Sequence, residues 1–485
     1  MPARTSSSDG YDLALVGAGA AGLWTAICAA EAGASVCLIS RKPLAESASF
    51  RAQGGLAAAL EAGDSPEQHA ADTIAAGRGL CRPSAVEALV EEAPGAVREL
   101  RRRGIRFDLE PDGRLALGLE GGHTRRRIVH AGGSQTGREI TGKLAALAAD
   151  QAHLCVREET SAVALWSDGE RCHGVLTESD PVRAASTVLA TGGAAALWRR
   201  TTNPWGAIGA GSVLAHAAGA ALADFEFCQF HPTALWLPGT RFDGLLITEA
   251  VRGEGAALLD REGRRFTDEL APRDAVTAAI LDRMTADATA HVGLDLREVE
   301  PTRFPSVFAS LRDAGLDATA GPVPVAPAAH YVMGGVAVDL DCRSSLPGLF
   351  AVGECSCSGL HGANRLASNS LSECFVFGRR AALAALDETP PGAAPPLPAW
   401  RFEPPSEEDR DAVWRLAGPQ RDPDRLRRLL ERPYPLARTI AAVALARRES
   451  RGGHRRLDAP AADPGLDGIH FVLGGDGEVR RERWD

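Results

Sequence analysis

The stretch YDLALVGAGAAG, residues Tyr11–Gly22, decides the fold of this chain. Its first half is a short apolar run that predicts a buried strand, and GAGAAG follows at once. The next residues, LWTAICAAEAG, have a helical pattern that ends at Gly33, and SVCLIS (Ser35–Ser40) predicts a second strand. This order of strand, glycine-rich turn, helix and strand predicts an α/β fold with a Rossmann-like domain.

The glycine-rich turn has the spacing GxGxxG, which is typical of a dinucleotide site when it joins a strand to a helix. Gly17 permits the tight turn, Gly19 lets a pyrophosphate approach the backbone, and Gly22 lets the helix pack close to the strand. The predicted cofactor-binding residues of this turn are Gly17, Ala18, Gly19, Ala20, Ala21 and Gly22.

The end of the second strand favours FAD over a nicotinamide dinucleotide. It reads Ser40-Arg41-Lys42 and lacks the acidic residue that commonly binds an adenosine ribose there. Large cofactors such as FAD need contacts from segments far apart in the sequence. Three further glycine-bearing segments meet that need: AQGG (Ala52–Gly55), TVLATGG (Thr187–Gly193) and LPGLFAVGE (Leu346–Glu354).

The chain has 485 residues, enough for about three domains. We expect the FAD-binding domain to comprise residues 1–224 and 332–390, with an inserted α+β capping domain at 225–331 and a ligand site between the two. A proline-rich linker, DETPPGAAPPLPAW, precedes a short C-terminal helical domain at 400–485. Ser406 and Asp409 predict the start of its first helix.

The composition excludes several classes of protein. The net charge of −10 argues against a nucleic-acid partner, and no run approaches the ~20 apolar residues of a membrane span. The N-terminal MPARTSSSDG lacks the apolar core of a signal peptide. Ten cysteines without a CxxC pair argue against a zinc or iron–sulfur site and, in so long a chain, against a disulfide framework, so a reducing cytoplasm is expected.

The polar segment HGANRLASNSLSE (His361–Glu373) directly precedes CFVFGRRAALAAL, a predicted buried helix that begins near Leu371. The N-terminus of a helix presents unpaired N–H groups and a positive dipole end, which suit the N1 and C2=O region of a reduced flavin. Arg365 would then face a ligand on the ring. The alternative is an ordinary capped helix after a loop.

Four cationic or protonatable residues lie among small or turn-forming neighbours: His231, Arg273, His330 and Arg365. If they converge, they make a site for a dianion, most simply a small dicarboxylate, because a guanidinium pairs bidentately with a carboxylate. The alternative for each histidine is a structural hydrogen-bonding role in the core.

The motifs GAGAAG, AQGG, FCQFHPTAL, TEAVRGEGA, LAPRD, AAHYVMGGV, FAVGE and HGANRLASNSL follow one another in an order that resembles the succinate dehydrogenase/fumarate reductase flavoprotein superfamily. Within it, the sequence is most similar to the L-aspartate oxidase family. The resemblance spans most of residues 10–385, and RRESRGGHRRLD (Arg447–Asp458) extends it into the C-terminal part. It implies FAD-dependent oxidation of L-aspartate to iminoaspartate, with oxygen or fumarate as electron acceptor, at the start of NAD biosynthesis through quinolinate.

Three features favour the oxidase branch. Ala48 stands where the dehydrogenases attach FAD covalently through a histidine, so FAD is expected to be non-covalent. The form ANRLASNSL resembles the oxidases, whereas the dehydrogenases usually read ANRLGANSL. Glu120, in LEGGHTRRRIVHA, matches the glutamate that orients the substrate's amino group. In a site for succinate, a carboxylate at this position would repel the dianion.

The resemblance also implies the roles of the site residues. His231, His330 and Arg365 hold the two carboxylates, and Arg273 is the proton donor or acceptor. The implied catalytic residues are Glu120, His231, Thr248, Glu249, Arg273, His330 and Arg365. Beyond the glycine-rich turn, the implied FAD contacts are Ser40, Arg41, Ala48, Ser49, Phe50, Arg51, Ala52, Gln53, Gly54, Gly55, Glu354, Ser370 and Leu371.

Two features depart from the family pattern. Ala210 replaces an aspartate that contacts the flavin, and the tail GIHFVLGGDGEVRRERWD matches no assigned segment. The alternatives are a soluble fumarate reductase or succinate dehydrogenase-type flavoprotein, and a flavoprotein that binds without turnover. Quinolinate synthase is an expected partner of the oxidase.

Overall fold

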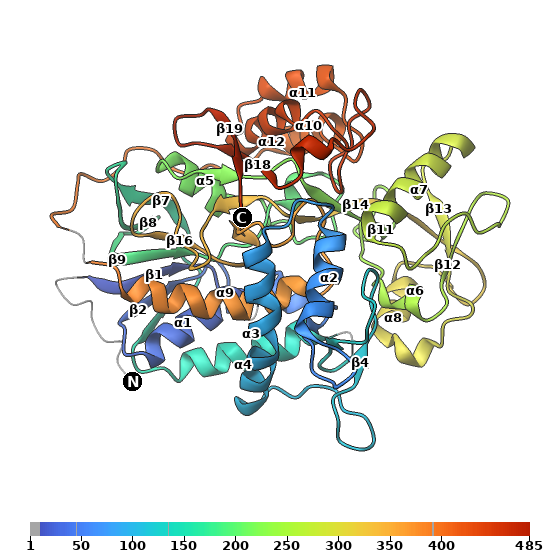
Figure 1. The fold of residues 1–485 in the computed structure, drawn as a ribbon, viewed down its shortest axis with the longest axis horizontal. Helices are drawn as coiled ribbons and strands as arrows, with labels where there is room; N and C mark the ends of the chain where they lie inside the picture. The colour runs from blue at the N-terminus through green and yellow to red at the C-terminus, as the bar shows by residue number, and fades with distance from the viewer. Residues whose placement is uncertain (1–9, 45, 134, 390–391) are drawn as a thin grey trace.

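The computed structural model describes residues 10–44, 46–133, 135–389 and 392–485. The predicted polar tail at 1–9 and residues 390–391 of the predicted linker lie outside this part. Figure 1 shows a body of strands and helices on the left, a second lobe around β11–β14 on the right, and the C-terminal helices above both.

The body is built on a sheet with the order β6-β2-β1-β9-β8-β7. Strand β1 lies between β2 and β9 and is parallel to both, and β6 is parallel to β2. The second half of β9 pairs with β16 in parallel, and its first half pairs with β8 in the antiparallel direction. The strands are β1 (Tyr11–Val16), β2 (Val36–Ile39), β6 (Leu154–Arg157), β7 (Ala162–Ser167), β8 (Cys172–Thr177), β9 (Pro181–Leu189) and β16 (Leu349–Ala351).

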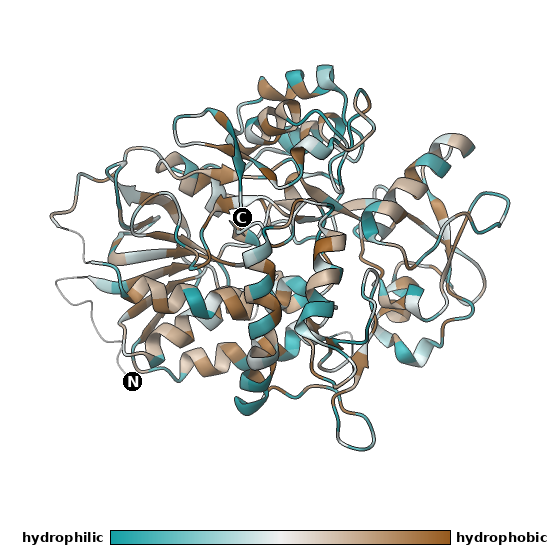
Figure 2. Ribbon diagram, viewed as in Figure 1, coloured by the Kyte–Doolittle hydropathy of each residue, from teal (hydrophilic) through white to brown (hydrophobic). Residues whose placement is uncertain are grey.

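Helices cover the parallel part of this sheet, and β1 and β2 confirm the two strands predicted around the glycine-rich turn. Helix α1 packs on α9, and α3 packs on the outside of α9. Figure 2 shows that the strands of the body and helices α1 and α9 are mainly apolar, whereas α3 carries both polar and apolar residues. The helices of the body are α1 (Ala20–Glu31), α2 (Pro66–Ala76), α3 (Pro83–Arg102), α4 (Thr136–Ala149), α5 (Ala210–Ala217) and α9 (Asn369–Leu386).

The second lobe is formed by the predicted insert. Its antiparallel sheet has the order β11-β14-β13-β12, and its own apolar core includes Leu258, Val276 and Leu294. The pairing of β11 with β14 shifts register after Gln229 and again after His231, and such irregularities re-aim side chains. The elements are β11 (Cys228–Leu235), α6 (Ala250–Gly253), β12 (Ala257–Leu259), α7 (Arg273–Asp287), β13 (Val292–Asp295), α8 (Pro305–Asp313) and β14 (Val323–Val332).

The C-terminal part joins the small sheet formed by the strands on either side of the insert. Its helices are α10 (Glu407–Leu416), α11 (Pro423–Leu430) and α12 (Pro435–Ala446). The predicted capping box of Ser406 and Asp409 is confirmed at the start of α10. The tail that matched no assigned segment forms a hairpin of β18 (Ile469–Leu473) and β19 (Val479–Arg483), and β18 pairs with β10. Strand β10 directly precedes the insert and pairs with β15, which directly follows it.

Two short sheets complete the fold. The first has the order β17-β15-β10-β18-β19, with β10 (Leu222–Ala223), β15 (Gly335–Ala337) and β17 (Ser356–Cys357). The second, β3-β5-β4, joins the AQGG segment to the loop that carries Glu120, with β3 (Leu56–Ala57), β4 (Leu117–Gly118) and β5 (Ile128–Val129).

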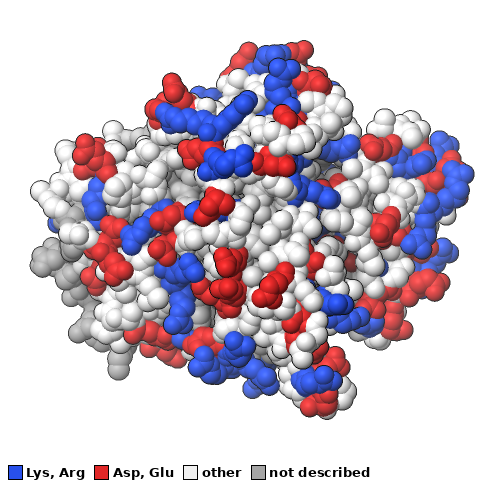
Figure 3. Space-filling view, in the orientation of Figure 1, with Lys and Arg blue, Asp and Glu red and all other residues white. Residues whose placement is uncertain are grey.

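The surface carries charges of both signs, and the cysteines are unpaired. Figure 3 shows positive and negative side chains interspersed over the visible face. Within the described ranges, no helix is both long enough and apolar enough to cross a membrane, and no cluster of His, Cys, Asp and Glu could hold a metal ion. All ten cysteines are free thiols.

Candidate active site between the two lobes

The glycine-rich turn has the geometry of a phosphate-binding loop. Gly17 has φ +113°, and a Cβ there would collide with the carbonyl oxygen of Ala190. A Cβ on Gly22 would collide with the carbonyl oxygen of Gly17, so this glycine lets α1 lie against the turn. Around a Cβ on Gly19, the nearest atom is the Ser49 hydroxyl oxygen at 3.2 Å. A side chain at position 19 would therefore crowd this hydroxyl at the start of α1, the kind of helix end that binds a pyrophosphate.

The predicted cofactor segments gather at the carboxyl ends of β1, β9 and β16. The hydroxyl of Ser49 accepts a hydrogen bond from the Ala20 N–H at 3.1 Å. A Cβ on Gly193, after β9, would collide with the Glu354 carboxylate after β16. Desolvation raises the pKa of Glu354 to about 8. This edge of a parallel sheet is where α/β folds bind their ligands.

Helix α9 begins at Asn369, two residues before the predicted start at Leu371. Ser368, just ahead of it, has a left-handed backbone with φ +62°. A Cβ on Gly54 of the AQGG segment would lie 3.3 Å from the Ser368 hydroxyl. The AQGG segment and the N-terminus of α9 are thus neighbours, and together they suit the flavin end of FAD.

Two of the implied FAD contacts, Arg41 and Ala48, are exposed. The Arg41 guanidinium donates to the carbonyl oxygen of Gly206 at 3.4 Å, and Ala48 is exposed ahead of the short helix Ser49–Arg51. Ala210, which replaces the family's aspartate, is the first residue of α5.

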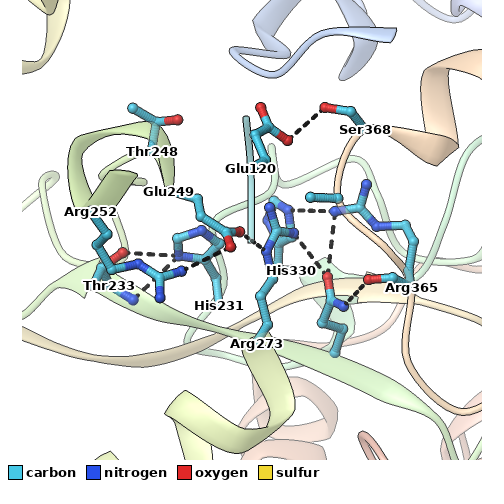
Figure 4. Close-up of polar contacts among 12 residues, drawn as sticks. Glu120, His231, Thr233, Thr248, Glu249, Arg252, Arg273, His330, Arg365 and Ser368 are labelled. Carbon is cyan, nitrogen blue, oxygen red and sulfur yellow. Dashed lines mark hydrogen bonds and ion pairs between the residues drawn. The ribbon is translucent and has the colours of Figure 1, made fainter. Parts of the chain in front are cut away.

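His231, Arg273, His330 and Arg365 converge, as Figure 4 shows. The rings of His231 and His330 lie 5.1 Å apart, and an Nη atom of Arg365 lies 3.4 Å from Nε2 of His330. The structure thus brings together four residues that are 134 positions apart at the extremes. The two histidines stand on paired strands, whereas Arg273 begins α7 and Arg365 precedes α9.

Both histidines are held neutral. Burial and the guanidinium of Arg273 lower the pKa of His231 and of His330 well below the ordinary histidine value. The backbone N–H of Thr233 donates to Nδ1 of His231 at 3.3 Å, so the proton of this ring sits on Nε2. His330 accepts from Arg365 at Nε2, and its Nδ1 faces the Thr202 hydroxyl at 2.7 Å.

Arg365 keeps its charge available for a ligand. It makes no ion pair among the described residues; its guanidinium lies 4.6 Å over the Tyr331 ring and donates to the Ser370 hydroxyl at 2.7 Å. Its Nε atom is buried without a hydrogen-bond acceptor in that part of the chain. Burial and nearby Arg273 lower the pKa of Arg365 to about 10, so it remains a cation at neutral pH.

Arg273 is held by the Glu249 carboxylate, which also pairs with Arg252. Glu249 accepts from its Nε at 2.6 Å, and Arg252 lies 3.3 Å from the same carboxylate. Burial favours the neutral acid, but the charges of Arg273 and Arg252 outweigh it and lower the pKa of Glu249 to about 2. Glu249 is thus an ionised partner of Arg273. Thr248 accepts from the Ala250 N–H at 3.4 Å at the start of α6.

Glu120 lies on the opposite side of the group in Figure 4, next to Ser368. The Ser368 hydroxyl donates to its Oε2 at 2.7 Å, and the side chain is only 7% exposed. A Cβ on the following Gly121 would collide with the Glu249 carboxylate. Glu120 therefore lies at the N-terminus of α9, and the residue that follows it abuts Glu249.

Four supporting residues were not predicted as site residues: Gln229, Arg252, Ser368 and Thr202. Gln229 accepts from Arg273 at 2.9 Å and from Arg365 at 3.4 Å. The motifs CQFHPTAL, TEAVRGEGA and ANRLASNSL contained three of them. Sequence did not reveal their partners, which lie on distant segments.

Comparisons with known proteins decide the family. A model described as FAD binding domain matches residues 12–371, and one described as fumarate reductase flavoprotein C-term matches residues 425–467. The L-aspartate oxidase of Caulobacter vibrioides is 45% identical, over 93% of this chain and 94% of that protein. That of Mycobacterium tuberculosis H37Rv is 41% identical, over 94% of each. The chain belongs to the L-aspartate oxidase family.

Solved structures of the wider superfamily have the same fold as this family member. A mutant of the flavoprotein FrdA of the E. coli quinol fumarate reductase is 30% identical with a TM-score of 0.87, and the match covers 98% of this chain and 96% of that one. Mycobacterium smegmatis Sdh1 is 33% identical with a TM-score of 0.83, over 97% and 93%. The predicted family, fold class and FAD cofactor are confirmed.

Proposed function

We propose that this chain oxidises L-aspartate to iminoaspartate, with oxygen or fumarate as electron acceptor. Beyond family membership, the observation that carries the proposal is the charge of the site. The site contains three guanidiniums, of which those of Arg252 and Arg273 pair with Glu249 and that of Arg365 does not, and a second carboxylate, Glu120, bonded to Ser368. These five groups leave one net positive charge. L-Aspartate carries two carboxylates and one ammonium, so its net negative charge matches this site.

FAD is held by the edge of the sheet and the two helix N-termini. The start of α1 would hold its pyrophosphate, and the AQGG segment together with Ser370-Leu371 would hold its flavin. When bound, FAD supplies the two-electron acceptor. Because Ala48 carries no imidazole, the cofactor is held without a covalent bond.

Different side chains of the site bind the different groups of the substrate. Arg365 binds one carboxylate, and His330 orients this guanidinium by accepting a hydrogen bond from it. The Nε2–H of His231 donates to the other carboxylate. Glu120 accepts from the amino group through the oxygen that Ser368 leaves free. This orientation presents the Cα hydrogen for transfer as a hydride, and the ammonium gives one proton to the Glu120 carboxylate as the protonated imine forms. Such positioning contributes about 7 kcal/mol or more at best.

Arg273 acts on the second substrate. When fumarate is the acceptor, the carbon that does not receive the hydride needs a proton, and Arg273 donates it. Glu249 holds this guanidinium in place, and Arg252 pairs with the same carboxylate. Soluble fumarate reduction is therefore part of the same activity, which the 30% identity to a quinol fumarate reductase supports.

We also propose a place for the enzyme in the cell. Iminoaspartate would be passed to quinolinate synthase in the synthesis of NAD, because an imine of this kind hydrolyses in water. The ten free thiols fit a reducing compartment such as the cytoplasm.

The test is a substrate panel. Purified protein is assayed for hydrogen peroxide with L-aspartate, D-aspartate and succinate. The proposal expects peroxide with L-aspartate and far less with the other two. Peroxide with succinate at a comparable rate would instead assign the chain to the dehydrogenase-type alternative.

A further inference from the structure

Asp274 lies where three segments of the site meet. It follows Arg273 in the first turn of α7, and its side chain is 10% exposed. Its carboxylate accepts two hydrogen bonds from Arg78, from Nε at 2.7 Å and from Nη2 at 2.9 Å. Oδ1 also accepts from the side chain of Asn364 at 3.3 Å. Arg78 and Asn364 belong to the body, so this carboxylate joins the two lobes.

These contacts close into a ring through Gln229. Its Nε2 donates to Oδ1 of Asn364 at 2.9 Å and to the carbonyl oxygen of Arg365 at 2.8 Å. Its Oε1 accepts from Arg273 and Arg365. Asp274 and Asn364 are each the chain neighbour of one of these arginines. The ring therefore sets how far apart the two guanidiniums stand.

The C-terminal segment Arg447–Asp458 supports both partners of Asp274. Arg451 donates to the backbone carbonyl of Arg78, and Glu449 holds Arg451 through two hydrogen bonds of 2.9 and 3.0 Å. Arg78 has φ +57°, a left-handed conformation that a non-glycine residue keeps only when its surroundings hold it.

The same segment also reaches the other partner, Asn364. The Gly453 N–H donates to the carbonyl of Ala363 at 2.9 Å, and a Cβ on Gly452 would collide with that carbonyl. Backbone contact at Ala363 fixes the residue that directly precedes Asn364. Both donors to the Asp274 carboxylate are thus braced from one side.

We propose that Asp274 and Arg78 are positioning residues: they clamp the capping lobe onto the body so that Arg273 and Arg365 stand at the separation a four-carbon dicarboxylate needs. The C-terminal segment braces this clamp. The inference rests on the proposed function and specifies how its carboxylate site is held. The clamp makes no contact with the amino group of the substrate. Its loss therefore weakens the binding of L-aspartate, fumarate and succinate by similar factors.

The test uses FAD-loaded full-length protein and the variants Arg78→Ala, Arg78→Lys, Asp274→Asn and the double variant Arg78→Ala/Asp274→Asn. Calorimetry measures the Kd of succinate, and steady-state assays separate KM from kcat for L-aspartate. Melting temperature and flavin absorbance report the folded, loaded fraction. The control is Arg297→Ala, since Arg297 also pairs bidentately with an aspartate, Asp295 at 2.9 and 2.6 Å, but within the capping lobe.

The clamp predicts that Arg78→Ala and Asp274→Asn each raise the Kd of succinate and the KM of L-aspartate about tenfold. Adding Arg78→Ala to Asp274→Asn changes either value less than twofold, because the two residues act as one pair. Arg78→Lys should give values between those of the wild type and of Arg78→Ala. The lysine ammonium keeps the positive charge but lacks the planar guanidinium that pairs bidentately with a carboxylate. Arg297→Ala stays within twofold of wild type.

Unchanged succinate binding in folded, flavin-loaded Arg78→Ala and Asp274→Asn would overturn the clamp, even if their melting temperatures fell. A rise in KM for L-aspartate without a rise in the Kd of succinate would also overturn it. Failure of the proposed function is a separate result: wild-type protein would then bind succinate but leave L-aspartate unoxidised.

Discussion

Replacing Glu120 with glutamine removes one negative charge from the site and leaves the shape of the side chain nearly unchanged. L-Aspartate, fumarate and succinate share a four-carbon chain and two carboxylates, so the cluster of arginines and histidines binds all three. Only L-aspartate has an ammonium. The Ser368 hydroxyl takes Oε2 of Glu120, and the other oxygen is left to accept from that ammonium.

The expected loss follows from the burial of this carboxylate. Glu120 is 7% exposed, so water competes little for the interaction. A charge-assisted hydrogen bond contributes about 1.5–3 kcal/mol, which corresponds to roughly a 10- to 150-fold change. Glu120→Gln should therefore lower kcat/KM for L-aspartate by a factor in that range. Fumarate reduction should change less than about threefold.

Two assays on one preparation decide the matter. Peroxide release measures L-aspartate oxidation, and anaerobic oxidation of a reduced dye measures fumarate reduction, with flavin absorbance used to count active sites. If both rates fell by the same factor, Glu120 would serve the fold or the flavin. The argument for substrate choice would then be wrong.

The remaining predictions concern the carboxylate site and the cofactor. Arg365→Ala should lower kcat/KM for L-aspartate at least tenfold, because loss of a buried charged partner typically costs about 2–5 kcal/mol; a change below threefold would show that Arg365 points elsewhere. Arg273→Leu should abolish fumarate reduction while flavin absorbance stays at the wild-type level, and unchanged turnover would remove Arg273 from proton transfer. Acid precipitation of the wild type should leave the yellow colour in the supernatant; colour in the pellet would contradict non-covalent FAD.

The parts of the fold that follow from local pattern were predictable. The spacing of Gly17, Gly19 and Gly22 between two apolar runs predicted β1, α1 and β2, because each glycine has a local steric reason. The start of α9 was predicted within two residues from a polar segment ahead of an apolar one. The terminal hairpin was not predicted. Its strand β18 is short and pairs with β10, which lies about 250 positions earlier in the chain.

The sequence suggested individual residues for the site, but not the contacts between them. His231, Arg273, His330 and Arg365 could be named from residue type and surroundings. The hydrogen bond of Ser368 to Glu120 spans 248 positions, and the pair of Arg78 and Asp274 spans 196. Nothing in the sequence around Arg78 singled it out. Only the fold shows that its backbone is held in a left-handed conformation and that its side chain crosses to the capping lobe.

The most direct test of the central claim is a single turnover without oxygen. Purified protein is mixed anaerobically with L-aspartate or with succinate, and the flavin absorbance is followed; fumarate is then added. The account predicts that L-aspartate bleaches the flavin, that succinate at the same concentration leaves it largely oxidised, and that fumarate restores the colour. Bleaching by succinate as fast as by L-aspartate would contradict the claim that this site is built for the amino acid.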